Sequence, residues 1–346
     1  MRIEKLLEIA IAMHASDLHI FPGLVPLLRI DGELVPIKDQ AVLSPEEAKG
    51  IIYEFMTEAQ HQMFEQELTL DFAFSRPELG NFRVSTLHQL HGVGAVLRLL
   101  SRRVPTLDEL GMPQIFKRFL KLPHGLILVT GPTGSGKSTT MAAMLEYINQ
   151  TRSAHIITIE DPIEYIHASK KSAISQLQVG RDTTDFAAAL RSSLRQDPDV
   201  VFVGEMRDLA TINLGLIAAE TGHLVVGTLH ASSAPMAVSR IVDMFPPQEK
   251  NRVRSMLSET MQAVLCQTLV KKKTGGRIAA FEIMLATPAV RNLIFQDLVG
   301  QIESTMQTNG DIGMCTMEQY VQELVNKQLV ASTVARSLIA NRRAFQ

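Results

Sequence analysis

The sequence predicts two α/β domains: a small mixed N-terminal domain and a larger domain built on a parallel sheet wrapped by helices. Three observations lead to this fold class. The 346 residues exceed the length of one typical domain. Beyond residue 113, continuous apolar runs alternate with helical segments, which is typical of strands covered on both faces. A glycine-rich turn follows the first of these runs. We expect domains over residues 1–100 and 114–346, joined by a charged, proline-bearing linker over residues 101–113.

The composition excludes several classes of protein. Hydrophobic residues make up 46% of the chain, enough for substantial cores. The 34 basic and 36 acidic residues nearly balance, which argues against a protein that coats nucleic acid. Cys266 and Cys315 are too few for a disulfide scaffold or a four-cysteine zinc site. So low a cysteine count fits a reducing cytoplasm, and we expect a cytoplasmic protein. No apolar run reaches the roughly 18–20 residues of a transmembrane helix, so we expect no transmembrane segment.

The N-terminal domain is predicted to be α+β, with two helices over a mainly antiparallel sheet and a PAS-like arrangement. An apolar stripe that starts at Ile3 predicts the first helix. Asp31-Gly32 predicts a tight turn between two strands. Ser44 and Glu47 form a capping box that opens the second helix. The expected strands lie in DLHIF (17–21), VPLLRIDGELVPI (25–37), LDFAFS (70–75), NFRVSTLHQL (81–90) and GAVLRLLS (94–101).

The second domain begins after another capping box, at Thr106 and Glu109. Its expected strands are the apolar runs over residues 125–130, 155–160, 200–205 and 224–230, and its expected helices cover residues 137–150, 183–196 and 208–221. From Pro247 onward the chain is expected to be mostly helical, with residues 248–270 as the longest helix. The lysines at 271–273 are then interpreted as solvated charge at the C-terminus of that helix.

A phosphate-binding motif lies at the glycine-rich turn, where the sequence matches G-x-x-x-x-G-K-[ST] in full. Its residues are Gly131, Pro132, Thr133, Gly134, Ser135, Gly136, Lys137 and Ser138, with Thr139 following. The glycines let several backbone N–H groups face a phosphate at the positive end of the next helix. Lys137 supplies a mobile charge for the β- and γ-phosphates, and the Ser138 hydroxyl reaches magnesium. The turn is therefore predicted to hold a nucleoside triphosphate.

Charged residues follow other predicted strands at the edge where ligands gather in such sheets. Glu205 ends the strand over residues 200–205, while Gly204 occupies the position where many such proteins have a metal-linked aspartate. A carboxylate there can hold the metal shell or orient a water. The end of the strand over 155–160 supplies three more carboxylates: Glu160, Asp161 and Glu164. His223 and His230 flank the last expected strand, and a histidine at such a strand end is a candidate sensor of the γ-phosphate.

Together these motifs resemble those of the secretion-ATPase superfamily of hexameric P-loop motors. Within it, the chain is similar to the PilT-like family of type IV pilus retraction ATPases. The matching segments, in order, are ASDLHI, FRV, VLRLL, the phosphate loop, IEDPIEY, VGEMRD and GHLVVGTLH. The resemblance covers residues 3 to about 330. It implies a RecA-like ATPase domain, a homohexamer, and ATP with Mg²⁺ bound between the two domains.

The resemblance also implies roles for individual residues. Glu205 and Glu164 would share metal binding and water activation, and which of them is the base stays open. His230 would couple the state of the γ-phosphate to domain motion. Arg83 and Arg98 would stabilise phosphate charge as arginine fingers from a neighbouring subunit. Three further arginines lie near the nucleotide motifs and are either phosphate contacts or ordinary ion-pair partners: Arg191, Arg195 and Arg207.

Retraction is favoured over extension, because extension motors carry an extra N-terminal domain and a tetracysteine site that this sequence lacks. The expected partner is an inner-membrane platform protein, with the motor peripheral at the inner face of the inner membrane. One segment departs from the family: residues 289–297, AVRNLIFQD, carry Phe295 and Gln296 in place of a charged pair. A paralogous accessory retraction ATPase or a secretion-system ATPase therefore stays open. A non-hydrolysing, nucleotide-gated scaffold and a small-molecule phosphotransferase are alternatives of other classes.

Overall fold

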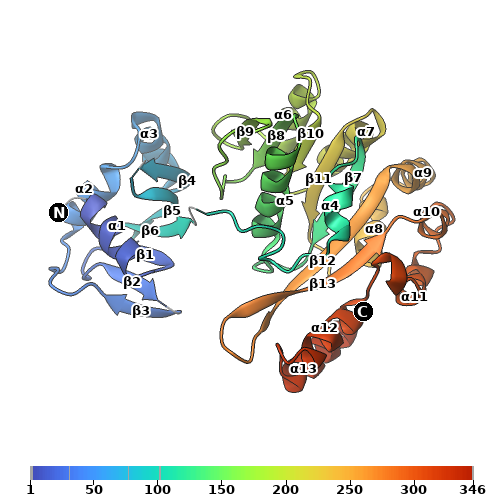
Figure 1. Ribbon diagram of the computed structural model, residues 1–346. Helices are drawn as coiled ribbons and strands as arrows, with labels where there is room; N and C mark the ends of the chain where they lie inside the picture. Colours follow the sequence, from blue (N-terminus) through green and yellow to red (C-terminus); the bar gives the residue numbers. More distant parts are fainter. Residues whose placement is uncertain (1–2, 31, 77, 101–102, 345–346) are drawn as a thin grey trace. The chain divides into compact units, whose positions relative to one another are not determined.

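The structure is a computed structural model that describes residues 3–30, 32–76, 78–100 and 103–344 (Figure 1). It divides into two compact units. The first holds the residues up to Arg103 together with Pro162–Ile166, and the second holds Val104–Asp161 and the residues from His167 onward. Each unit has its own sheet and its own hydrophobic core. Within the expected linker, residues 101 and 102 lie outside the described residues.

The first unit is built on a six-stranded sheet with the order β3-β2-β1-β6-β5-β4. All of its strand pairs are antiparallel, as the sequence predicts. The strands are β1 Asp17–Ile20, β2 Leu27–Ile30, β3 Glu33–Pro36, β4 Thr69–Arg76, β5 Gly80–Gln89 and β6 Gly92–Leu100. In the turn between β2 and β3, Asp31 lies outside the described residues, and Gly32 has a φ of +94°, which favours glycine.

Helices of the first unit are α1 Ile3–Ala12, α2 Pro45–Tyr53 and α3 Glu58–Glu67. The predicted stripe of α1 is buried, and the predicted capping box at Ser44 opens α2. The sequence prediction missed α3. Of its ten residues only Phe64 is buried, so it has no apolar stripe to recognise. Its own capping box, at Thr57 and Gln60, was the available signal.

The second unit is built on a seven-stranded sheet with the order β13-β12-β7-β11-β10-β8-β9. All neighbours are parallel except β12 and β13. The strands are β7 Gly125–Thr130, β8 His155–Glu160, β9 Ala173–Gln178, β10 Val200–Val203, β11 Leu224–Leu229, β12 Met261–Lys271 and β13 Arg277–Leu285. Parallel strands end together, so the chain leaves β7, β8, β10 and β11 at one side of the sheet. We call this side the carboxyl edge and the opposite side the amino edge.

Helices cover both faces of this sheet, which is why every residue of β7, β10 and β11 is buried. Right-handed crossovers place α5 on one face and α6, α7 and α8 on the other (Figure 1). The helices up to this point are α4 Ile115–Phe119, α5 Lys137–Thr151, α6 Phe186–Ser193, α7 Leu209–Glu220, α8 Ala234–Asp243 and α9 Lys250–Thr260. The predicted capping box at Thr106 and Glu109 is present, although it opens a turn and not an α-helix.

The prediction of one long helix over residues 248–270 was wrong. Helix α9 ends at Thr260, and the chain continues as β12, which pairs with β7 on one side and β13 on the other. The stretch Ala263–Cys266 is buried throughout. A short continuous apolar run of this kind has no periodicity that separates a buried strand from a buried helix. Pairing with β7, which is far away in the sequence, determines that these residues form a strand.

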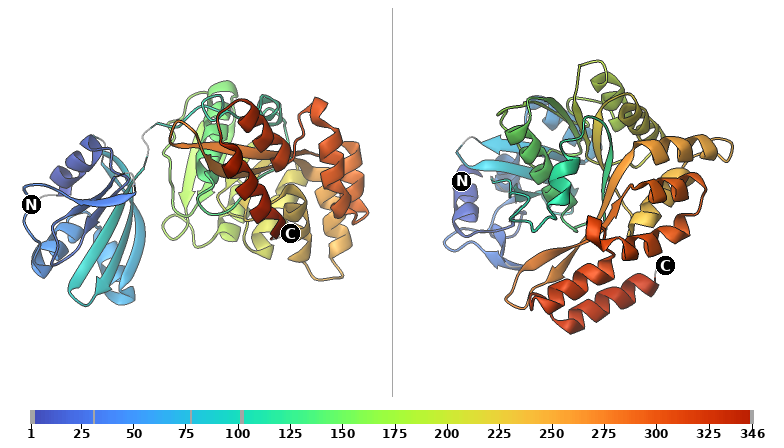
Figure 2. Two further views of the ribbon diagram at one scale, coloured as in Figure 1. Left: turned by 90° about the horizontal axis from the view of Figure 1, so that it is seen from below. Right: turned by 45° about the vertical axis from the view of Figure 1, so that its right-hand side comes forward.

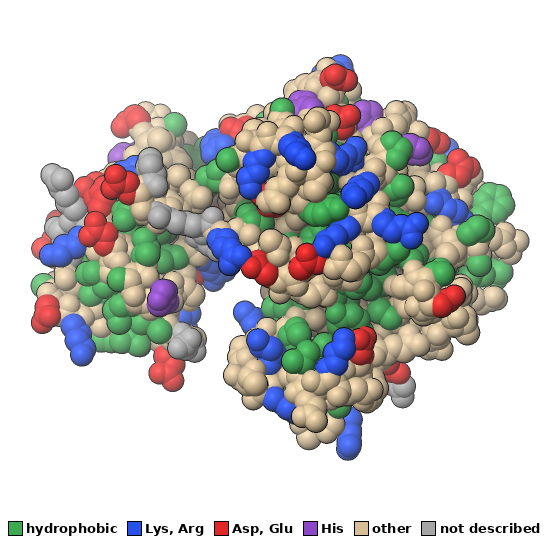
Figure 3. Space-filling view, viewed as in Figure 1, with side chains coloured by type: hydrophobic (Ala, Val, Ile, Leu, Met, Phe, Trp, Pro, Cys, Tyr) green, Lys and Arg blue, Asp and Glu red, His purple; other side chains and the backbone are tan. Residues whose placement is uncertain are grey.

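The C-terminal helices are α10 Pro288–Phe295, α11 Ile302–Thr308, α12 Met317–Asn326 and α13 Ser332–Ala344, with short 3-10 helices η1 Val299–Gln301 and η2 Gly310–Ile312. Helices α12 and α13 lie beside the β12–β13 hairpin and share a small core with it (Figure 2). The lysines at 271–273 lie at the end of this hairpin and not at a helix C-terminus, because residue 271 ends β12. Lys and Arg side chains gather over this part of the surface (Figure 3).

Candidate active site

The backbone of the phosphate loop requires glycine at three positions between β7 and α5. Gly131, Gly134 and Gly136 have φ values of +146°, +76° and +89°, which side chains rarely tolerate. A Cβ on Gly131 would lie 2.3 Å from the main-chain oxygen of Gln267. Gly134 has no atom within 4 Å of its Cβ position, so the loop is open there. The sequence motif therefore folds into a tight loop with one open side.

The polar side chains of this loop fit a phosphate ligand. Lys137 Nζ donates to the main-chain oxygens of Gly131 (2.9 Å) and Pro132 (3.0 Å), so its charge is held inside the loop. Ser138 is exposed in the first turn of α5. The Ser135 hydroxyl is buried, and within the described part of the chain it has no hydrogen-bond partner. An orphaned hydroxyl and a fixed ammonium beside an open backbone indicate a site for an anionic group.

Glu205 lies at the carboxyl edge between two basic side chains. Its Oε1 is 3.4 Å from Nε2 of His230, and its Oε2 is 3.6 Å from Nε of Arg207. The chain brings these residues together because β10 and β11 are parallel neighbours. Gly204 must be small, because a Cβ there would lie 3.0 Å from the main-chain oxygen of Ile159. Gly204 thus allows β10 and β8 to approach each other closely beside Glu205.

The three carboxylates at and after the end of β8 have different surroundings. Asp161 accepts a hydrogen bond from Arg207 (2.8 Å), which joins it to the Glu205 cluster. Glu160 accepts hydrogen bonds from Thr158 (2.6 Å) and Gln176 (3.0 Å), so it is tied to β8 and β9. Glu164 is half-buried in the segment that follows β8. Of the three, Asp161 is connected directly to the acidic group at the end of β10.

Three residues that the sequence placed among the nucleotide motifs are not at the carboxyl edge. His223 precedes β11 and therefore lies at the amino edge, where its Nδ1 is 3.0 Å from the main-chain oxygen of Ala218. Arg191 and Arg195 are exposed near the end of α6, and Arg195 donates to the main-chain oxygen of Arg191. The neighbouring residue 196 contacts the first residue of β8, which fixes this end of α6 at the amino edge. Sequence proximity to a motif did not reveal which edge each residue occupies.

Arg83 and Arg98 belong to the first unit, where they are direct neighbours across β5 and β6. Arg98 Nε is 2.9 Å from Oδ1 of Asp17, a carboxylate that is nearly fully buried. The arginine side chain itself is 64% exposed, so the aspartate fixes its orientation without covering it. Two guanidinium groups are thus presented side by side on one sheet.

Comparisons with known proteins identify the family of this chain. Residues 1–334 match the family described as Type II/IV secretion system protein. The chain belongs to this family. It is 52% identical to the type IV pilus retractation ATPase PilT of Pseudomonas aeruginosa, over 97% of both chains. It is 49% identical to the twitching motility protein of Neisseria gonorrhoeae, over 91% of this chain and 84% of that protein. A crystal structure of the pilus retraction motor PilT with bound ADP matches with a TM-score of 0.92 and 44% identity, covering 97% of this chain and 96% of that one.

The predictions of an ATPase and of a RecA-like domain behind a smaller N-terminal domain are thereby confirmed. As a member of this family of ATPases, the protein binds nucleotide. Within the ranges that the structure describes, no helix has the length and apolar character needed to cross a membrane.

In the segment that departs from the family, residues 289–297, the first part contacts neighbouring elements and the last part is exposed. Arg291, in α10, donates to the main-chain oxygens of Ser258 (2.5 Å), Glu259 (2.6 Å) and Ala286 (2.9 Å). It therefore caps the last turn of α9. Phe295, by contrast, is 59% exposed at the end of α10. The changed positions lie at the surface, and the retained arginine holds two helices together.

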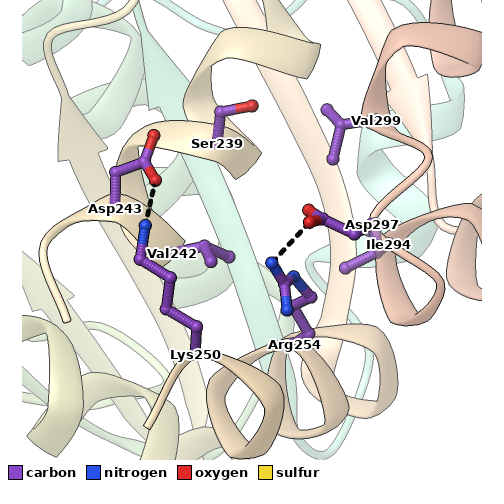
Figure 4. Close-up of a pocket in the computed structure, with 8 residues that line it drawn as sticks. All are labelled: Ser239, Val242, Asp243, Lys250, Arg254, Ile294, Asp297 and Val299. Atoms are coloured by element: carbon purple, nitrogen blue, oxygen red, sulfur yellow. Dashed lines mark hydrogen bonds and ion pairs between the residues drawn. The ribbon is translucent and has the colours of Figure 1, made fainter. Parts of the chain in front are cut away.

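A pocket of about 160 Å³ lies between α8, α9 and the end of α10 (Figure 4). Its charged side chains form two pairs: Asp243 with Lys250 and Arg254 with Asp297, each at 2.5 Å. Asp297 is the last residue of the departing segment. The pocket is separate from the phosphate loop, and its paired charges are part of the packing between these helices.

Proposed function

We propose that the protein is an ATP-hydrolysing motor that assembles as a homohexamer and powers the retraction of a type IV pilus. One observation carries the proposal: a complete phosphate loop lies at the same carboxyl edge as Glu205, whose carboxylate contacts His230 and Arg207. The chain that carries this site is 52% identical to a pilus retraction ATPase over nearly its full length. The first unit adds two adjacent arginines, Arg83 and Arg98, suited to complete a neighbouring protomer's site.

ATP with Mg²⁺ is the proposed ligand of the phosphate loop. Lys137 binds the β- and γ-phosphates, and the Ser138 hydroxyl is the protein's direct metal ligand, with Glu205 and Glu164 acting through water. Magnesium, when bound, supplies positive charge that stabilises phosphoryl transfer. In the described parts of the chain, no group of three His, Cys, Asp or Glu side chains is arranged to hold a metal. Phosphate oxygens and water would supply the remaining ligands, as is usual for magnesium in nucleotide sites.

Glu205 is the proposed general base for the attacking water. Two contacts support it over Glu164: His230 and Arg207 hold the Glu205 carboxylate from two sides, and Arg207 also binds Asp161. A base must be fixed in its ionised form within reach of the water that it activates. His230 follows β11 and Asp161 follows β8. A shift of the Glu205 carboxylate would therefore displace side chains at the ends of these two strands. This linkage is the proposed route from hydrolysis to motion.

The proposed partner is an inner-membrane platform protein, with the motor peripheral at the cytoplasmic face of that membrane. A paralogous retraction ATPase is a second proposed partner. Deletion of the gene in the organism of origin tests the function: we expect an excess of surface pili that do not retract, and loss of twitching motility. Complementation with wild-type protein should restore retraction, and complementation with Glu205→Gln should not. Bald cells would refute retraction, and retained retraction would indicate an accessory role.

Turnover by the purified protein separates the motor from a non-hydrolysing scaffold. We expect steady, multiple-turnover phosphate release that depends on Mg²⁺ and is lost below the concentration at which the ring assembles. Nucleotide binding without release would support the scaffold. Activity of the monomer with a small phosphate acceptor would support a phosphotransferase. Stimulation by added DNA would contradict the expectation that nucleic acid is not a partner.

A further inference from the structure

Strand β12 runs past the end of β7 and lies against the phosphate loop. The last residue of β7, Thr130, pairs with Cys266 of β12. The next residue of β12, Gln267, therefore lies beside the first residue of the loop, Gly131. Its main-chain oxygen is the atom that would be 2.3 Å from a Cβ on Gly131. The closeness of this strand thus explains why the loop must begin with glycine.

The Gln267 side chain makes two buried hydrogen bonds to the loop and to the helix that follows it. It is 3% exposed. Its Nε2 donates to the main-chain oxygen of Ser135 (2.8 Å), and its Oε1 accepts from the Thr140 hydroxyl (2.7 Å). The orientation of the amide is fixed by this arrangement, because a main-chain oxygen can only accept. The hydroxyl then has to serve as the donor to Oε1.

These contacts determine where one loop N–H group points. In a planar trans peptide, the C=O of one residue and the N–H of the next point in opposite directions. Because the C=O of Ser135 points toward Gln267, the N–H of Gly136 points away from β12. A phosphate loop works by aiming such N–H groups at the ligand before it arrives. Without the amide of Gln267, this peptide unit would be free to rotate.

We infer that Gln267 is a positioning residue for the nucleotide: it orients the Ser135–Gly136 peptide and locks the loop and α5 to β12. The inference rests on the proposed function only through nucleotide binding at this loop, and not on pilus retraction. It assigns a task in the ATPase site to a strand that carries none of the motifs recognised in the sequence.

Gln267→Met tests the inference, because methionine has a similar size and shape but no amide. Affinity is measured with a fluorescent ADP analogue at 25 °C, together with KM and kcat for MgATP and the melting temperature of the protein. We expect the Kd for nucleotide and the KM for ATP to rise on the order of tenfold. We expect kcat to change less than KM, because Glu205 and His230 are untouched.

Gln262→Met is the matched control, since it is the same substitution on the same strand at the amino edge. Gln262 accepts a hydrogen bond from Arg291 and has no part in the phosphate loop. We expect it to leave Kd and KM unchanged. Nucleotide affinity and KM within twofold of wild type in folded Gln267→Met protein would overturn the inference. Failure of the wild-type protein to bind nucleotide would instead refute the proposed function.

Thr140 supplies a second test that is independent of how well Gln267→Met folds. Thr140→Val removes the donor that orients the amide while keeping the shape, and Thr140→Ser keeps the hydroxyl. We expect the valine variant to weaken nucleotide binding by about threefold, and the serine variant to restore it. In a double-mutant cycle, Thr140→Val should add nothing to Gln267→Met. Equal affinity of the valine and serine variants would contradict the assignment.

Discussion

Strand β11 is flanked by two histidines whose contacts are of different kinds. At the carboxyl edge, His230 contacts the carboxylate of Glu205. At the amino edge, His223 contacts the main-chain oxygen of Ala218, near the end of α7. A contact between two polar side chains can be exchanged for a contact with a ligand. The contact with a helix carbonyl instead ties the residue before β11 to the end of α7, where the backbone N–H of His223 donates to the same oxygen.

The arginines at the two edges show the same difference. Arg207, at the carboxyl edge, binds two carboxylates, Asp161 and Glu205. Arg291, at the amino edge, binds two main-chain oxygens of α9 and that of Ala286, the residue after β13. The same residue types contact ionisable side chains at one edge of this sheet, where we propose the chemistry, and main-chain oxygens at the other. Substitutions at the two edges should therefore separate turnover from stability.

The largest expected effect on activity comes from Glu205→Gln at the carboxyl edge. Glutamine keeps the size but cannot accept the proton of the attacking water. We expect the ATPase rate to fall by at least about 100-fold, with nucleotide affinity within a few-fold of wild type. Phosphate release and fluorescent nucleotide binding measure the two quantities.

Asp243→Asn is the matched control for Glu205→Gln. It also neutralises a carboxylate paired with a basic side chain, Lys250, but in the pocket between α8 and α9. We expect turnover to be unchanged. If the two variants lose turnover equally, the assignment of Glu205 as base is wrong, and if Glu164→Gln alone abolishes turnover, the role passes to Glu164.

Arg291→Met should have the largest effect on stability at the amino edge. It leaves the oxygens of Ser258, Glu259 and Ala286 without their charged donor. We expect the free energy of unfolding of the second unit to fall by about 2–4 kcal/mol, measured by denaturant titration. Arg252→Met, which breaks an exposed pair with Glu249, should cost less than about 1 kcal/mol. Equal losses would show that the capping bonds of Arg291 contribute little.

Much of the fold could be predicted from the sequence because its signals are local. The apolar runs of β7, β8, β10 and β11 are continuous, since helices cover both faces of the sheet. The phosphate loop is recognisable because its backbone demands glycine at fixed spacing. The acidic group at the end of β10 follows from the rule that parallel strands end at a common edge.

What the sequence did not predict depends on pairing between distant segments. Residues 261–271 form a strand only because β7 and β13 lie on either side, and the same apolar run suits a buried helix. Gln267 was missed for that reason, since a glutamine in a helix has no expected contact with a loop more than 120 residues earlier. His223 and Arg195 became candidates because they lie near motifs in the sequence, but nearness in the sequence does not show which edge of the sheet a residue occupies.

A pair of histidine variants compares the edges most directly. We expect His230→Ala to lower the ATPase rate about tenfold, the size expected from the loss of one orienting contact to Glu205, without lowering the melting temperature. We expect His223→Ala to lower the free energy of unfolding by about 1 kcal/mol and to leave turnover unchanged. The reverse pattern would contradict the division of the sheet into a chemical and a structural edge.

The smallest expected effect concerns a buried histidine that supports the fold, His167. Its side chain is 3% exposed, with Nδ1 3.5 Å from Oε2 of Glu146 on α5. Burial lowers the pKa of His167 below its ordinary value, although Glu146 acts in the opposite direction. The unfolded chain therefore binds this proton more readily, and the free energy of unfolding should fall as the pH drops through about 6.5. His167→Gln should make denaturant midpoints between pH 7.5 and pH 5.5 less dependent on pH, by at most one proton. A steeper dependence in the variant would show that the Glu146 carboxylate, and not burial, controls this histidine.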